Sequence, residues 1–327
     1  MAKIINGSVW LAHMQMALET KANILNTGAV EINRVDVTSQ GGLTWTRPYQ
    51  DALDTIANPA GYMATTALTP TTLGDQKEIL LVCNEWDGYF GVDYNTLARG
   101  SNDTVTASLQ QIANVATNSL QDWLVATAKG AFGTAGALST THIYDGSSIG
   151  DGYISAQTMI KGVQDIYGES MQDMNVMVVN SLVYTDMLLL GLVEYKDAGT
   201  FGQNILATGS IPTVLGMRIV VNDTMCAKIG DYYPSYILKG QPFYLGYTQT
   251  LTLEEGRDAL TGGGKDYVTW KHSFVPGLKY ISFTGTVPTP TTAVAKTDLS
   301  TPDNWTALTV PANQIGIMQI QTSGGRA

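Results

Sequence analysis

The chain has 327 residues, a formal net charge of −10 and a charged fraction of only 14%. This acidic balance excludes tight binding to nucleic acid, which needs clustered Lys and Arg to displace counterions. No apolar run reaches the roughly 18 residues of a membrane-spanning helix, so we expect no membrane partner.

The sequence of residues 1–30 predicts a mostly polar N-terminal arm with one short helix that begins at Trp10. We expect residues 31–80 to form a long loop that projects from the body, here called the excursion. Two extended segments flank a stretch rich in Pro, Gly and Thr, and these residues supply few apolar side chains for a core. Trp45 and Arg47 lie on this excursion, where such side chains suit a contact between subunits. Packing within the subunit is an equally good interpretation. Trp10 is the candidate contact on the arm.

The clearest helix signal runs from Ser101 to Gly130. Polar residues at its start offer N-cap oxygens, Lys129 complements the helix dipole in the last turn, and Gly130 is placed to end the helix. At about 1.5 Å per residue the helix would be roughly 40 Å long. Its apolar residues recur three or four positions apart: Val105, Leu109, Ile112, Ala116, Leu120, Trp123 and Leu124.

A glycine-punctuated loop follows, and then helices alternate with short apolar strands, which predicts a compact α/β lobe of about ninety residues. Ser155 is placed to cap the first of these helices, and Ser181 or Asn180 the second. The predicted helices are Ser155–Tyr167 and Ser181–Leu192, and the predicted strands are Met174–Val179, Gly216–Val221 and Tyr236–Leu238.

Two long β stretches come next, Pro242–Leu253 and Asp266–Phe283, and we expect the turn-rich stretch Glu254–Lys265 to join them. The chain from Thr284 is rich in Thr and Pro. It ends in one more extended piece, Ile315–Ile320, whose partner the sequence does not identify.

Cys83 and Cys226 stand in apolar surroundings without Cys-x-x-Cys or Cys/His spacing. We therefore expect two buried, reduced thiols, as in a reducing cytoplasm. The first residues contain no continuous apolar core, so we expect no signal peptide.

Each motif that could carry catalysis has a more ordinary interpretation. Gly262–Lys265 lacks the Ser or Thr that a phosphate-binding loop places after its Lys, and a hairpin tip is favoured. Glu254, Glu255 and Asp258 are expected to be solvated carboxylates in a turn. The histidines are too scattered for a ligand set, and His272 alternates inward within a strand, which favours a packed side chain. We expect no enzyme, no cofactor and no metal.

The order of these parts resembles the major capsid proteins of tailed bacteriophages, which have the Hong Kong 97-like fold. The resemblance covers residues 75–283 in order, and the arm and excursion loosely. Four segments carry it: the helix and strand of Asp151–Asn180, the stretch Thr213–Asp223, which looks like the family's "LG-x-x-V-x-V-x-D" strand, Arg257-Asp258 in a turn before a long strand, and Phe274–Leu278 near that strand's end.

This resemblance implies an α+β fold in which the long helix is a spine whose apolar stripe faces the closing strands. The tail lies outside the family core and is expected to be an extra surface arm. The implied parts are an N-terminal arm (1–30), an extended β-loop (31–80), a peripheral domain with the spine helix (81–140), an axial domain (141–238), the closing β hairpin of the peripheral domain (239–284) and a C-terminal tail (285–327).

The resemblance also implies a function: a coat protein that assembles into hexamers and pentamers of an icosahedral head shell around double-stranded DNA. Its location would be the virion, after assembly in the host bacterial cytoplasm. The short arm implies a separate scaffolding protein, and a portal and a decoration protein are further candidate partners, while packaged DNA would be contacted only weakly. The alternatives are an encapsulin-like compartment shell and a soluble hydrolase or binding module.

Overall fold

The computed structural model describes residues 24–36, 43–50, 75–90, 104–196, 211–258, 265–289 and 291–325. The helical segments are η1 (Ile24–Thr27), α3 (Thr104–Phe132), α4 (Ala156–Tyr167), η3 (Gly168–Ser170), α5 (Ser181–Leu189), α6 (Lys296–Ser300), η6 (Pro302–Asn304) and η7 (Ala312–Gln314). The strands are β1 (Val30–Arg34), β2 (Thr44–Gln50), β3 (Asp75–Leu81), β4 (Cys83–Phe90), β5 (Ile143–Asp145), β6 (Met174–Val179), β7 (Glu194–Lys196), β8 (Ile211–Val214), β9 (Met217–Val221), β10 (Tyr233–Lys239), β11 (Phe243–Asp258), β12 (Lys265–Leu278), β13 (Ile281–Phe283), β14 (Trp305–Ala307) and β15 (Ile317–Thr322).

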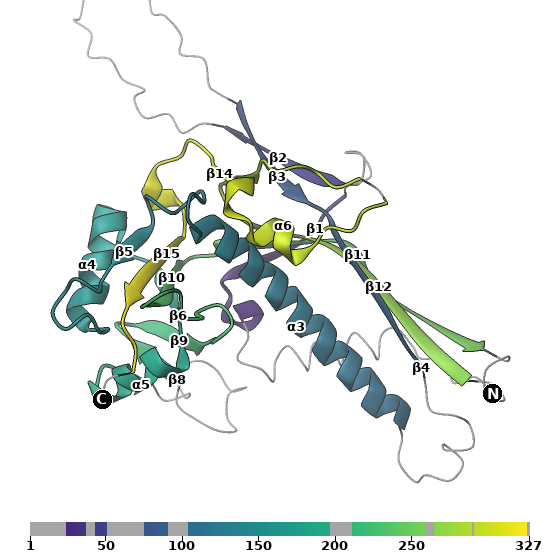
Figure 1. The fold of residues 1–327 in the computed structure, drawn as a ribbon, viewed down its shortest axis with the longest axis horizontal. Helices are drawn as coiled ribbons and strands as arrows, with labels where there is room; N and C mark the ends of the chain where they lie inside the picture. The colour runs from purple at the N-terminus through teal and green to yellow at the C-terminus, as the bar shows by residue number, and fades with distance from the viewer. Residues whose placement is uncertain are drawn as a thin grey trace, which may run out of the picture.

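One half of the molecule is a four-stranded sheet in the order β1-β11-β12-β4, with α3 running beside it (Figure 1). Strand β12 is antiparallel to both β11 and β4. The rings of Trp123 on α3 and Phe274 on β12 meet edge to face, with centroids 5.8 Å apart. Leu120 and Trp123 are buried, so the prediction that the closing strands pack on this helix is confirmed.

The predicted start of this helix at Ser101 lies outside the described residues, and α3 is described from Thr104. Leu109 and Ile112 lie outside the residues whose side chains are described, so their place in the core stays a prediction. None of the described helices is long and apolar enough to cross a membrane.

Gly130 does not end the helix, because α3 continues to Phe132. Its role is close packing. A Cβ atom on Gly130 would lie 2.1 Å from the carbonyl oxygen of Leu299 and 2.5 Å from Nε1 of Trp305. The glycine is therefore explained by another backbone that approaches the helix, and the expectation of a C-cap is wrong.

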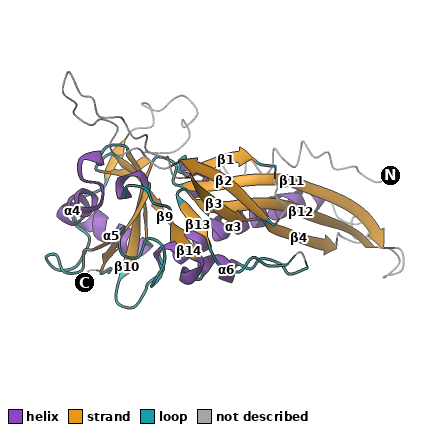
Figure 2. Ribbon diagram, turned by 90° about the horizontal axis from the view of Figure 1, so that it is seen from above, coloured by secondary structure: helices purple, strands orange, loops and turns teal. Residues whose placement is uncertain are grey.

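The other half is a seven-stranded sheet in the order β5-β15-β10-β6-β9-β8-β7, accompanied by α4 and α5 (Figure 2). The predicted α/β lobe is confirmed in its main elements. Ser155 caps α4 by accepting a hydrogen bond from the Thr158 backbone, and Asn180, the second of the two candidates, caps α5. Helix α5 ends at Leu189, three residues before its predicted end.

The segment after residue 284 is not a surface arm, and that expectation is wrong. Strand β15 pairs with β10 on one side and with β5 on the other, which supplies the partner that the sequence did not identify. Ile317, Met318 and Ile320 are completely buried. Upstream, α6 packs on α3 and Trp305 is only 3% exposed. The C-terminal segment therefore contributes buried side chains to both halves of the molecule.

The stretch Glu254–Asp258 is strand and not turn. It continues β11 and pairs with β12, where Glu254 lies opposite Thr269 and Arg257 opposite Asp266. The β-branched and aromatic residues of β12 favour this pairing, which outweighs the local turn signals. Arg257-Asp258 accordingly lies in a strand, and the expectation that Glu254, Glu255 and Asp258 lie in a turn is wrong. Residues 259–264, which include most of the glycine-rich stretch, lie outside the described residues.

Candidate self-association surfaces

The described residues contain no group of three or more His, Cys, Asp or Glu side chains that could hold a metal ion. Cys83 and Cys226 are buried free thiols, as predicted, and burial raises the pKa of both. His142 is buried, and its Nε2 lies 2.9 Å from the carbonyl oxygen of Ala312. These groups have structural roles, so the candidate functional features are exposed surfaces and buried charges.

Trp45 and Arg47 lie on the β2–β3 hairpin, at the base of the excursion. The indole of Trp45 stacks on Tyr244 with ring centroids 4.9 Å apart and an interplanar angle of 3°. Arg47 donates two hydrogen bonds to Oε2 of Glu78, at 2.7 and 3.0 Å, and its guanidinium lies over the Tyr244 ring. Both side chains thus pack within the subunit, which was the alternative interpretation. Their contact with other subunits stays a prediction, and Trp10 lies outside the described residues.

Glu78 is a buried carboxylate at the root of this hairpin. Its side chain is 0% exposed, and its Oε1 has no hydrogen-bond partner among the described residues. Burial raises the pKa of Glu78 to about 7, although the nearby Arg47 opposes this shift. A group that titrates near neutral pH therefore lies where the excursion joins the body.

A second carboxylate, Glu85 on β4, is partly buried, with 17% of its side chain exposed, and ties the sheet to α3. Its Oε2 lies 2.8 Å from Nε2 of His272, and its Oε1 accepts hydrogen bonds from Ser119 and from Nε1 of Trp123, at 2.5 and 2.6 Å. Burial raises the pKa of Glu85, but the hydrogen bonds from His272, Ser119 and Trp123 lower it more, to about 2. The sequence predicted that His272 is packed, but it did not identify Glu85 as the partner of this histidine. Cys83 and Glu85 are two residues apart on β4 and therefore lie on the same face of the sheet, which was the available signal for Glu85.

These two carboxylates predict a stability maximum near pH 4.5. Glu78 keeps a proton in the folded chain between its ordinary pKa of 4.5 and about 7, so stability falls as pH rises through that window, by up to about 3 kcal/mol. Glu85 affects stability in the opposite direction, because its pKa in the folded chain is lowered to about 2. The stability that Glu85 contributes is present above pH 4.5 and is lost as pH falls toward 2. Urea midpoints between pH 3 and 8 measure both limbs.

The variant Glu78→Gln separates the two contributions, because its side chain keeps the shape of Glu78 and cannot ionise. We expect it to flatten the decline between pH 4.5 and 7 and to leave the acid limb unchanged. An unaltered decline would show that Glu78 is not its cause.

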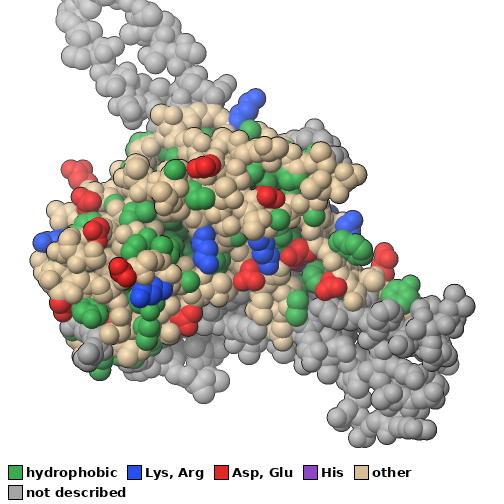
Figure 3. Space-filling view, in the orientation of Figure 1, with side chains coloured by type: hydrophobic (Ala, Val, Ile, Leu, Met, Phe, Trp, Pro, Cys, Tyr) green, Lys and Arg blue, Asp and Glu red, His purple; other side chains and the backbone are tan. Residues whose placement is uncertain are grey.

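Helix α5 lies in the seven-stranded lobe, on the side of the molecule away from the tips of β11 and β12 (Figure 1), and it carries exposed leucines. Leu182 and Leu189 are 44% and 71% exposed and lie on one side of the helix, two turns apart. Leu188 and Leu190 are exposed beside them, and Figure 3 shows hydrophobic side chains at the surface of this lobe. We call these four leucines the α5 surface. Exposed apolar patches of this kind mark contacts with other proteins.

No family model matches the sequence, and no curated protein is significantly similar to it. Solved structures do match. The capsid of Ralstonia phage GP4 contains a chain with a TM-score of 0.60 at 9% identity, over 93% of this chain and 92% of that one. The head structure of Helicobacter pylori bacteriophage KHP40 gives a TM-score of 0.55 at 8% identity, over 90% and 87%. The capsid of the cyanophage P-SCSP1u gives 0.53 at 10% identity, over 91% and 87%.

The predicted fold class is confirmed. The chain has the α+β fold of these phage capsid chains along nearly its whole length. The division into arm, loop, peripheral and axial parts stays a prediction.

Proposed function

We propose that this chain is the major capsid protein of a tailed phage, a coat subunit that self-assembles into the icosahedral head shell around double-stranded DNA. The observation that carries the proposal is the fold, shared with three phage capsid chains over about nine tenths of both partners. At identities near 10%, a match of that extent reflects the whole arrangement of elements and not one common motif.

The proposed mechanism is the cooperative assembly of identical subunits through several different surfaces. The axial domain (141–238) would meet its copies around the symmetry axes of hexamers and pentamers through the α5 surface. The peripheral parts (81–140 and 239–284) would bridge capsomers, and the arm and extended loop would lie across neighbours. Many interfaces of modest size then close one container, because symmetry repeats each of them. The net charge of −10 would keep packaged DNA mobile against the wall.

The remaining partners and the place of assembly are also proposals. A separate scaffolding protein, a portal and a decoration protein would complete the shell, with assembly in the host bacterial cytoplasm and final location in the virion. Electron microscopy of the expressed protein, with and without its scaffold, should show closed shells or tubes. A protein that stays monomeric under all assembly conditions and turns over a substrate would overturn the proposal. Particles that package an enzyme in place of DNA would identify a compartment shell.

The α5 surface makes a specific prediction. Leu189 is 71% exposed but is the last residue of α5, where an Asp has lower helix propensity and faces the negative end of the helix dipole, so Leu189→Asp should lower the free energy of unfolding by only about 1 kcal/mol. In a shell, the same change places a charge in an apolar contact and should abolish assembly. Particle yield by sedimentation, beside urea unfolding of the subunit, measures both effects.

The matched control is Val287→Asp, which introduces the same charge at another exposed apolar position, 39% exposed, outside the lobe that carries α5. It should assemble at wild-type yield. Wild-type shell yield from the Leu189→Asp protein would remove α5 from the interface.

A further inference from the structure

The face of the four-stranded sheet that points away from α3 carries a large exposed aromatic side chain. Glu85 and His272 face α3, because their side chains are joined and Glu85 also accepts hydrogen bonds from that helix. Side chains alternate along a strand, so Trp86 on β4 and Lys271 on β12, which lie directly opposite one another, are on the other face. Trp86 is 78% exposed, and most of its indole is therefore available to a ligand.

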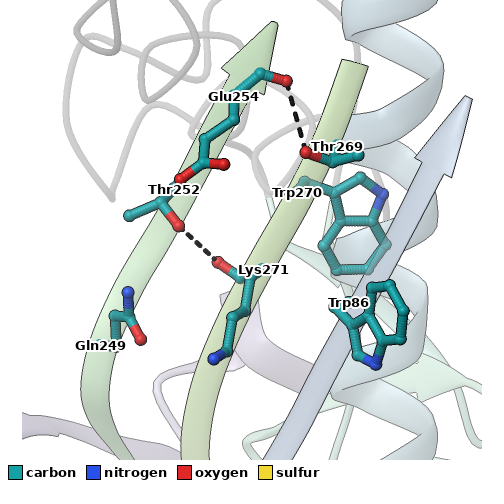
Figure 4. A pocket seen from close by; sticks show the side chains of 7 residues that line it. All are labelled: Trp86, Gln249, Thr252, Glu254, Thr269, Trp270 and Lys271. Carbon is teal, nitrogen blue, oxygen red and sulfur yellow. Dashed lines mark hydrogen bonds between the residues drawn. The ribbon is translucent and has the colours of Figure 1, made fainter. Parts of the chain in front are cut away.

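Trp86 forms one wall of a hollow of about 490 Å³, within the roughly 300–1,000 Å³ of ligand pockets. The other lining residues come from two neighbouring strands (Figure 4): Gln249, Thr252 and Glu254 from β11, and Thr269, Trp270 and Lys271 from β12. The pairing of β11 with β12 shifts its register twice between Tyr247 and Thr252. Such bulges bend a strand and redirect its side chains, and they are frequent beside binding sites.

Polar side chains surround the exposed ring. The Thr252 hydroxyl donates to the backbone carbonyl oxygen of Lys271 at 3.3 Å (Figure 4). The Thr269 hydroxyl donates to that of Glu254 at 3.4 Å, and each hydroxyl oxygen keeps lone pairs that accept hydrogen bonds. Gln249 supplies a donor and an acceptor, and Glu254 and Lys271 carry opposite charges. The lining is therefore balanced in charge and in hydrogen-bonding groups.

These features favour an uncharged sugar over other ligands. A sugar ring combines a face of C–H groups, which stacks on an aromatic ring, with hydroxyl groups that donate and accept hydrogen bonds. A nucleic acid base would also stack on Trp86, but its phosphates require clustered basic side chains, and the lining contains one, Lys271. A protein contact has an apolar centre, whereas Trp86 is here the one exposed apolar side chain of the lining.

A buried hydrogen-bond donor adjoins the same tryptophan. Trp86 and Trp270 also line a second hollow, of about 350 Å³, between β4 and α3. Trp270 is only 4% exposed, yet its Nε1 has no hydrogen-bond partner among the described residues. Figure 4 shows this nitrogen directed away from β11. A sugar hydroxyl that extends from Trp86 past the edge strand would supply the missing acceptor.

We propose that this face of the sheet binds an uncharged oligosaccharide. One sugar ring stacks on Trp86, and hydroxyl groups of that ring and its neighbours bond to the polar side chains of Gln249, Thr252 and Lys271. The inference goes beyond the proposed shell function and does not depend on it, because all of these residues lie within one subunit.

Titration calorimetry of the full-length protein tests the proposal, with maltotriose, cellotriose and triacetylchitotriose as probes. We expect at least one of them to bind. Trp86→Ala should weaken that binding about tenfold because the stacking surface is lost, and Trp86→Phe, which keeps a ring, should stay within about threefold of wild type. Val287→Ala, at another exposed apolar position, is the control and should bind as wild type does. Because Trp86 is exposed, urea midpoints of its variants should match wild type, which separates lost binding from lost folding.

The inference is wrong if none of the three sugars binds, if Trp86→Ala binds as well as wild type, or if a short oligothymidylate binds more tightly than every sugar. If no sugar binds and Trp86→Ala abolishes shells, Trp86 is a contact between subunits: the sugar site fails and the shell function stands. If a sugar binds through Trp86 and no shells form, the shell function fails and the sugar site stands.

Discussion

A chain that ends at Gly316 should not fold its seven-stranded sheet. The truncation removes β15, which lies between β5 and β10 and, among the described strands, is the one that links β5 to the rest of the sheet. It also removes the buried side chains of Ile317, Met318 and Ile320. At about 1.5–3 kcal/mol for each buried side chain, the loss is roughly 5–9 kcal/mol, comparable with the entire stability of a domain.

Circular dichroism and urea unfolding of the truncated chain measure this loss, and limited proteolysis should show cleavage within the lobe that contains α4 and α5. A chain that ends at Gly324 is the control. It keeps β15 and loses only the last residues, including the hydrogen bond from the Gly325 backbone to Asp186, so its midpoint should stay close to that of the full chain. A normal transition in the shorter chain would contradict the central place of β15.

The C-terminal segment shows where prediction from sequence reached its limit. Its composition favours loop, and the extended character of Ile315–Ile320 was visible, but a strand's partner depends on pairing with residues far away in the chain. Here the partners are β10 and β5, and β5 lies about 170 residues earlier. Helix α3 was predictable from its apolar spacing, and α4 from its apolar spacing and its Ser155 cap, because these signals are local. The family resemblance that implied the fold class rests on the order of such local elements.

The charged side chains of the interior were harder to predict. His272 could be assigned to a core because it alternates with apolar neighbours along one strand. Its pairing with Glu85 required knowledge of the register between β12 and β4. The same holds for Arg47 and Glu78, which lie opposite one another across the β2–β3 pair. A single sequence does not specify that register, and a surface contact was therefore as good an interpretation for Arg47 as an internal ion pair.

Gly130→Ala should destabilise the protein by about 2–4 kcal/mol, although alanine is the better helix former by about 1 kcal/mol. The new methyl group would lie 2.1 Å from the Leu299 carbonyl oxygen, a backbone atom that cannot rotate away. Either α6 moves off α3, or the hydrogen bond from Trp305 Nε1 to that oxygen, 2.7 Å long, is broken. Both outcomes expose the buried Trp305 and Leu299. The cost of overpacking exceeds the gain in helix propensity.

Gly162→Ala in α4 is the matched comparison, because it brings the same gain in helix propensity. There the new Cβ atom would meet the side chains of Tyr144 and Ile320 at 3.0–3.3 Å, and side chains can shift by a few tenths of an ångström. Urea unfolding should therefore place the two variants far apart, with Gly162→Ala within about 1 kcal/mol of wild type. A Gly130→Ala protein as stable as wild type would mean that the C-terminal segment does not hold the long helix by backbone contact. The glycine would then need another explanation.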